Sequence, residues 1–195
     1  MKKSKGVFCL EGDWHSDFGR RSSVKPILDL LDQNDTRRVP HIYRDVGTSE
    51  ELDFYLAKWV QKQYSRYKIL YLGFHGVPRA ILVGDQRKAG GVRELPSLAE
   101  LLRGKCKGRL IFFSSCSVMN QDKRHLKSFL RSTGAAAMCG YSSDVDWMKS
   151  AAFELIAIRE MQLNPFTVKG AHAIEDRVRG HARGLKLEFR MVINE

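Results

Sequence analysis

The sequence predicts an α/β protein built on a mostly parallel sheet of about six strands, with helices on both faces. Short apolar runs alternate along the chain with longer segments in which apolar residues recur every three or four positions. Two of the runs, residues 69–72 and 110–113, are apolar at every position, as expected of parallel strands buried on both faces. The 195 residues contain no linker or low-complexity tract, so we expect a single domain over residues 1–195.

The individual elements follow from local signals. The strands are expected at residues 6–10, 39–43, 68–74, 110–113, 135–141 and 185–193, and the helices around residues 24–31, 52–64, 98–102, 126–130, 151–161 and 168–178. Thr48 and Glu51 form a capping box before the second helix. Residues 79–95 carry two short apolar runs separated by glycines, which predicts a hairpin outside the main sheet. The last strand alternates apolar and charged residues, so we expect it at an edge with one face covered.

Composition excludes some classes of protein. Hydrophobic residues make up 43% and charged residues 28% of the chain, which is ordinary for a globular protein. The sequence shows neither a signal peptide nor an apolar run of roughly 18 residues. We therefore expect a cytoplasmic protein without a membrane interaction.

The net charge of +11 comes from 33 basic and 22 acidic residues. Eight basic residues and one acidic residue fall within residues 103–131. Such an excess can bind phosphates, but no zinc finger, recognition helix or aromatic platform accompanies it, so nucleic acid is an unlikely partner. A solvated basic face or a site for an acidic protein explains the charge better.

Four cysteines occur, at positions 9, 106, 116 and 139, and no two form a C-x-x-C pair. This spacing predicts no zinc ribbon or thioredoxin-type site, and we expect no metal or cofactor. Three of the four have an inert explanation. Cys9 and Cys139 lie in apolar strands, and Cys106 lies in a turn between lysines.

The chemistry is predicted at the ends of two strands. His75 and Gly76 follow residues 69–74, and Ser114, Ser115 and Cys116 follow residues 110–113. If these strands are parallel neighbours, an imidazole and a thiol emerge together at the edge where open α/β sheets bind ligands. A histidine can take the proton of a thiol and so create a nucleophilic thiolate. The N–H groups of Gly76 and Cys116 could hold an oxyanion.

No aspartate or asparagine is evident as an orienting partner for His75, so the prediction is a His–Cys dyad. Each residue alone has a plainer explanation, because a histidine after a strand is often a turn residue and a buried cysteine is often inert. It is the pairing of the two strand ends that favours catalysis.

This order of elements resembles the caspase-like (clan CD) cysteine peptidases, and is most similar to the bacterial CHAT (caspase HetF-associated with TPRs) group. The similarity covers residues 6–161 and includes residues 134–146 beyond the dyad. It implies a three-layer caspase-like sandwich, with His75 as general base, Cys116 as nucleophile and Gly76 in the oxyanion hole. The implied reaction is hydrolysis of peptide bonds through a thioester, without metal. CHAT domains usually belong to larger proteins, so the resemblance also implies a separate protein activator.

The sequence departs from the caspases around the substrate site. Caspases have Gln-Ala-Cys and bind a substrate aspartate with arginines, whereas here Ser114 and Ser115 precede Cys116. Relatives that cut after arginine or lysine place acidic residues at strand ends. The resemblance therefore implies a basic or small residue before the cleaved bond, and it implies substrate-binding roles for Asp13, Trp14, Asp17, Ser114, Asp144 and Asp146.

Several of these residues also have structural explanations. Asp146 is well placed to cap a helix, and Asp144 could be a plain loop residue. Trp14 and Trp147 would form an apolar wall for the substrate, or else belong to the core.

Three functions remain to be compared. The first is a cysteine endopeptidase acting on a protein or peptide. The second is a catalytically silent caspase-like module that binds a protein partner as a scaffold or regulator. The third, a flavodoxin-like protein for a small anion, is disfavoured because the first strand ends in Glu11-Gly12-Asp13, which is acidic and not a phosphate-binding loop.

Overall fold

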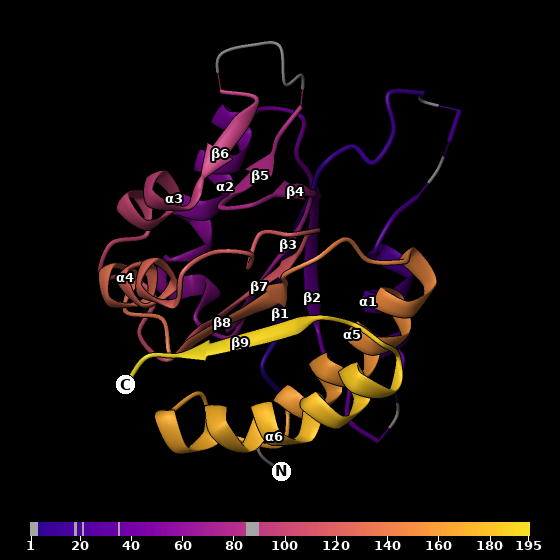
Figure 1. Cartoon of the computed structure of the whole chain (residues 1–195), viewed down its shortest axis with the longest axis vertical. Coiled ribbons are helices and arrows are strands. Elements are labelled where there is room, and N and C mark those ends of the chain that lie inside the picture. The colour runs from indigo at the N-terminus through magenta and orange to yellow at the C-terminus, as the bar shows by residue number, and fades with distance from the viewer. Residues whose placement is uncertain (1–3, 18, 21, 35, 85–89) are drawn as a thin grey trace.

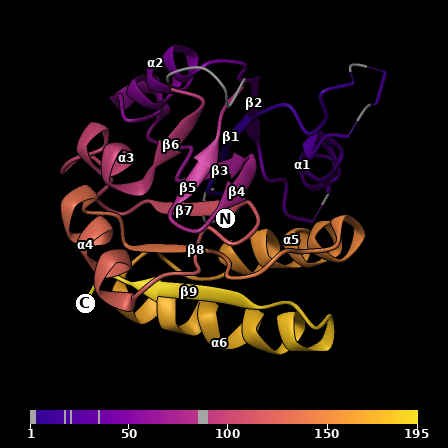
Figure 2. The same cartoon turned by 45° about the horizontal axis from the view of Figure 1, so that its top comes forward.

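The structure, a computed structural model, describes residues 4–17, 19–20, 22–34, 36–84 and 90–195. Its main sheet has the strand order β2-β1-β3-β7-β8-β9, in which β9 is antiparallel to β8 and the other neighbours are parallel. Helices cover both faces (Figures 1 and 2). The predicted fold class is confirmed.

The strands of the main sheet are β1 (Val7–Glu11), β2 (His41–Asp45), β3 (Ile69–Gly73), β7 (Leu110–Ser114), β8 (Ala137–Tyr141) and β9 (Phe189–Ile193). The helices are α1 (Lys25–Asp32), α2 (Ser49–Trp59), α3 (Leu95–Leu101), α4 (Lys123–Thr133), α5 (Trp147–Met161) and α6 (Val168–Gly184), with a short 3₁₀ helix η1 (Lys62–Tyr64).

The two faces of the sheet bury two separate apolar layers, because successive strand residues point to opposite sides. Phe113, for example, packs in the layer formed with α2, α3 and α4, and Phe112 packs in the layer formed with α1, α5 and α6. Figure 1 shows the same division, with α2, α3 and α4 on one side of the sheet and α1, α5 and α6 on the other. The central strands β1, β3 and β7 are buried throughout, as their apolar sequences predict.

The two strands that were expected to carry the chemistry are neighbours. β3 pairs in parallel with β7, and Gly73 lies opposite Ser114 at their carboxyl ends. His75 lies two residues beyond that pair on one strand, and Cys116 two residues beyond it on the other. The prediction that these two strands are parallel neighbours is therefore confirmed.

The predicted hairpin is present and includes one more strand than expected. β4 (His75–Val77), β5 (Ala80–Leu82) and β6 (Val92–Glu94) form a separate antiparallel sheet. Residues 85–89 of the hairpin lie outside the described residues. His75 is thus the first residue of a strand that leaves the main sheet, rather than part of a loose turn.

The last strand differs from its prediction. α6 ends at Gly184 and residues 185–188 form a turn and a connecting segment, so the strand is shorter than residues 185–193 and spans Phe189–Ile193. It lies at the sheet edge as expected, but the prediction of one covered face is wrong. Val192 packs in the α2–α4 layer while Met191 and Ile193 pack in the opposite layer. The alternation on which the prediction rested lies largely before the strand begins.

Within the described part of the chain, no helix is both long and apolar enough to cross a membrane.

Candidate active site

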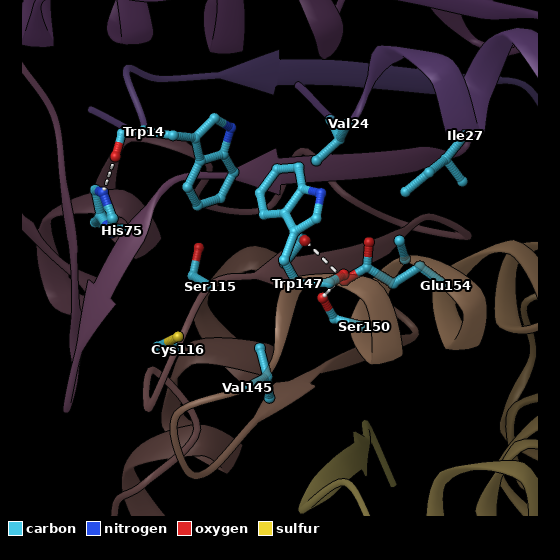
Figure 3. Close-up of a pocket in the computed structure, with 12 residues that line it drawn as sticks. Trp14, Val24, Ile27, His75, Ser115, Cys116, Val145, Trp147, Ser150 and Glu154 are labelled. Carbon is cyan, nitrogen blue, oxygen red and sulfur yellow. Dashed lines mark hydrogen bonds between the residues drawn. The ribbon is translucent and has the colours of Figure 1, made fainter. Parts of the chain in front are cut away.

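A cavity of about 150 Å³ opens at the carboxyl ends of the central strands. The loop after β1, the start of β4, the end of β7 and the first turns of α5 all contribute to its wall (Figure 3). The lining residues are Trp14, Val24, Ile27, His75, Ser114, Ser115, Cys116, Val145, Trp147, Ser150, Ala151 and Glu154. His75 and Cys116 therefore lie on the wall of one cavity, although 41 positions separate them in the chain.

The backbone of Gly76 is packed directly against the loop that carries Cys116. A Cβ atom at position 76 would lie 2.3 Å from the carbonyl oxygen of Cys116 and 2.9 Å from Cβ of Ser115. Only glycine fits at so close an approach. The absence of a side chain at Gly76 therefore allows the two strand ends to lie close together. Cys116 is partly exposed, whereas the thiols of the other three cysteines are buried.

His75 is oriented by a backbone group. Its Nε2 lies 2.8 Å from the carbonyl oxygen of Trp14, as the dashed line in Figure 3 shows. A carbonyl oxygen can only accept, so Nε2 carries the proton and donates it to this bond. In the neutral ring Nδ1 is then the basic nitrogen. The indole of Trp14 also meets the imidazole edge to face, with ring centroids 5.4 Å apart.

Glu11, the last residue of β1, holds the loop that supplies this carbonyl. It is 2% exposed. Its carboxylate accepts hydrogen bonds from the indole N–H of Trp14, the backbone N–H of Val24 at 2.7 Å, the hydroxyl of Ser23 at 2.7 Å and that of Tyr43 at 2.6 Å. Glu11 was not among the site residues predicted from the sequence. The available signal was a glutamate in the final position of an otherwise apolar buried strand.

A second buried glutamate, Glu154 on α5, forms the inner wall of the cavity. It is 1% exposed and accepts hydrogen bonds from the hydroxyls of Tyr71, Ser114 at 2.7 Å and Tyr141 at 2.9 Å. Burial raises its pKa to about 7, against the opposing effect of these hydroxyls. Burial and the nearby carboxylate raise the pKa of both tyrosines. Glu154 was not predicted from the sequence as a site residue, whereas its hydrogen-bond donor Ser114 was.

The four predicted aspartates lie outside the cavity wall. Asp13 and Asp17 are exposed and line a separate polar hollow next to Glu11. Asp144 accepts a hydrogen bond of 3.0 Å from the hydroxyl of Ser117. Asp146 caps α5 by accepting from the backbone N–H of Lys149 at 2.9 Å, as its position in the sequence indicated. None of the four lines this cavity, and the substrate-binding roles expected for them stay predictions.

The predicted apolar wall has a counterpart in the structure. Trp14 and Trp147 meet edge to face with ring centroids 5.0 Å apart, and both line the cavity. Figure 3 shows the two indoles side by side between the His75–Cys116 end and the Glu154 end. Trp147 keeps 37% of its surface exposed, so it is not a core residue.

The basic segment of residues 103–131 is not entirely a surface feature. Arg109 is 7% exposed, stacks over the ring of Trp59 at 4.6 Å and donates to the Trp59 carbonyl at 2.6 Å.

Among the described residues, no group of three or more histidine, cysteine, aspartate or glutamate side chains is placed to hold a metal ion.

Comparison with known proteins adds information on the fold. The X-ray structure of a secreted C11 cysteine protease from Bacteroides thetaiotaomicron, in complex with an irreversible peptide inhibitor, matches with a TM-score of 0.59 at 10% identity. The match covers 98% of this chain and 66% of that protease, so the chain spans just under two thirds of its length. At this identity the match shows a shared caspase-like fold, which the resemblance had implied.

At the level of sequence, no curated protein matches the chain. A family model does match, over residues 4–162, which is most of the chain. The chain belongs to this family, DUF6642, which is described as a family of unknown function.

Proposed function

We propose that the protein is a cysteine endopeptidase in which His75 and Cys116 form the catalytic dyad. The observation that supports this most directly is their position on one cavity wall, at the ends of adjacent parallel strands. Gly76 allows the backbone of His75 and that of Cys116 to lie close together, because a Cβ at position 76 would clash with the Cys116 carbonyl. Cys116 is also the cysteine with an exposed surface, as a nucleophile for a polypeptide must be.

In the first half of the reaction, Nδ1 of His75 takes the proton of the Cys116 thiol, and the thiolate attacks the carbonyl carbon of the peptide bond. The carbonyl π electrons move to the oxygen, and the N–H groups of Gly76 and Cys116 stabilise the resulting oxyanion. Among the described residues nothing accepts a hydrogen bond from the Cys116 N–H, so this donor is free.

The tetrahedral intermediate then collapses. The C–N bond breaks, the amine leaves with the proton held on His75, and a thioester to Cys116 remains. His75 next removes a proton from water, which attacks the thioester, and the thiol and the carboxyl product are released. Throughout, the Trp14 carbonyl fixes the ring through Nε2–H and its dipole stabilises the imidazolium. The proposed dyad thus has a backbone orienting group.

A peptide bearing a thiol-directed electrophile, such as an acyloxymethyl ketone, tests this proposal. We expect labelling of the native protein at Cys116, measured by intact mass and peptide mapping. Labelling is lost in Cys116→Ala and falls at least tenfold in rate in His75→Ala, because the thiolate is no longer generated by an adjacent base. Cys106→Ala serves as the matched control and is expected to label normally, since Cys106 is buried.

The same experiment separates the peptidase from a catalytically silent module. In a silent module the probe would react with Cys116 at the rate of an ordinary exposed thiol and would be insensitive to His75→Ala. Equal labelling of Cys106 or Cys139 would mean nonspecific thiol chemistry. Either result contradicts the proposal.

A further inference from the structure

Cys116 and Glu154 line the same cavity, and the indoles of Trp14 and Trp147 form part of its wall (Figure 3). In the proposed reaction the attacked carbonyl carbon must approach the sulfur to roughly 3–3.5 Å. The substrate side chain nearest to the cavity then belongs to P1, which is the residue whose carbonyl carbon is attacked. Most of the wall it meets is apolar and comes from tryptophan, valine, isoleucine and alanine side chains.

Glu154 is the carboxylate among the residues lining this cavity. All three of its hydrogen-bond donors are neutral hydroxyls. No lysine, arginine or histidine of the described residues forms an ion pair with it. When Glu154 ionises, its charge is therefore buried without a counter-ion, which is costly.

The titratable groups facing Glu154 from the neighbouring strands do not supply that counter-ion. Cys9 and Glu11 face it from β1, Tyr71 from β3, and Cys139 and Tyr141 from β8. Each of them is neutral or negative near pH 7. None of these groups supplies a positive charge to Glu154, whereas a cationic occupant of the cavity would.

We propose that Glu154 determines the P1 selectivity of the proposed peptidase: its ionised carboxylate selects a lysine or arginine side chain, and its protonated form admits an uncharged apolar one. The apolar walls accept the aliphatic part of either side chain. This inference rests on the proposed function and assigns the role to a residue outside the four aspartates considered from the sequence.

The two states are accessible under ordinary conditions. Because burial raises the pKa of Glu154 to about 7, both forms are populated near neutral pH. A cationic side chain in the cavity stabilises the ionised form, and an apolar side chain displaces water and stabilises the protonated form. Selection of P1 and the proton on Glu154 are therefore linked, and raising the pH shifts the preference toward a cation.

Two peptide substrates that differ only in P1, lysine or norleucine, test the inference. Norleucine has the same aliphatic chain as far as Cε but lacks the ammonium group. We expect the ratio of kcat/KM for lysine over norleucine to rise at least tenfold between pH 6 and pH 8 in the wild-type protein. Taking the ratio cancels any pH dependence of the chemical step and any change in the active fraction, because both affect the two substrates equally.

Three variants sharpen the test. In Glu154→Gln the ratio should be low and independent of pH. In Ser114→Ala a hydrogen bond to the ionised carboxylate is lost, so the midpoint of the rise should move to higher pH. Asp146→Asn is the matched control, because it removes a carboxylate from the start of the same helix and retains a capping side chain. Its ratio should match that of the wild-type protein.

The inference is overturned if Glu154→Gln keeps the wild-type ratio and pH dependence, if the midpoint does not move in Ser114→Ala, or if Asp146→Asn alters the ratio as much as Glu154→Gln. Should Glu154→Gln fail to fold, the midpoint in Ser114→Ala still decides. Absence of Cys116-dependent cleavage of either peptide overturns the proposed function itself. Cleavage of both with a ratio that ignores Glu154 overturns only this inference.

Discussion

Two groups of carboxylates surround the candidate site, and they differ in burial. Glu11 and Glu154 are 2% and 1% exposed, and each accepts hydrogen bonds from at least three groups on different elements. The second group, Asp13, Asp17, Asp144 and Asp146, is exposed. A charge acts strongly through the protein interior and weakly through water and salt. We therefore expect the buried pair to influence the site more strongly than the exposed four, which are the carboxylates that the sequence indicated.

The two buried glutamates also differ from each other. Glu11 accepts a backbone N–H as well as side-chain donors, and these contacts tie the loop after β1 to the sheet. Glu154 accepts only hydroxyls and borders the cavity. We infer that the first carboxylate positions the loop that orients His75, and that the second is free to respond to what enters the cavity.

The largest expected effect comes from Glu11→Ala. The change leaves the buried N–H of Val24 and the indole N–H of Trp14 without their acceptor, so we expect the free energy of unfolding to fall by about 4 kcal/mol. Asp13→Ala, two residues further on, should change it by less than about 0.5 kcal/mol because Asp13 is exposed. Urea unfolding at pH 7 measures both. Similar losses in the two variants would erase the distinction between buried and exposed carboxylates.

The next effect is a pH dependence of stability due to Glu154. Its folded pKa of about 7 lies above its ordinary value of 4.5, so the folded state holds the proton more tightly than the unfolded state. The contribution of Glu154 to the free energy of unfolding is fully present below pH 4.5. It is lost as the pH rises through 7, by about 3 kcal/mol in all.

Glu154→Gln should remove this loss. Relative to the wild-type protein, the variant is expected to gain stability between pH 5 and pH 8, as measured by denaturant unfolding at each pH. The same slope in both proteins would show that Glu154 ionises normally in the folded state, and the contrast with the exposed carboxylates would then fail.

The sequence predicted the parts of the site that depend on strand order. Runs of apolar residues at 69–72 and 110–113 marked two buried parallel strands. Of the residues that follow them, His75 and Cys116 line one cavity, and Gly76 packs against the backbone of Cys116. The prediction succeeded because neighbouring parallel strands necessarily bring their carboxyl ends to one edge.

The remaining parts depend on tertiary contacts that leave little trace in a sequence. Glu154 follows Phe153 in an apolar helix, and nothing local indicates that hydroxyls from β3, β7 and β8 converge on it. The orienting group of His75 is a backbone carbonyl, which every residue possesses. The four aspartates were considered because they follow strands, but position after a strand does not reveal whether a side chain points inward.

A smaller effect is expected from Trp14→Phe. Phenylalanine keeps an aromatic wall and the backbone carbonyl but removes the indole donor to Glu11. We expect the loop to loosen, with kcat falling about tenfold through poorer alignment of His75 and unfolding free energy falling by about 1 kcal/mol. Ser23→Ala is the control, because its hydroxyl also donates to Glu11 but does not contact His75. An equal loss of kcat in both variants would mean that the lower stability alone, and not the contact between Trp14 and His75, reduces the rate.

The smallest effect is expected from Asp146→Ala. Loss of the N-cap of α5 should cost about 1 kcal/mol, and Asp146→Asn should recover most of it, because a neutral oxygen can accept the same bond from the Lys149 N–H. Thermal or urea unfolding at pH 7 distinguishes the two. If asparagine does not restore stability, then the charge of this exposed aspartate matters as well as its hydrogen bond. The exposed and buried carboxylates would then differ in how strongly their charge acts, and not in whether it acts. For Glu154 we expect the charge, which is buried without a counter-ion, to determine the behaviour of the site.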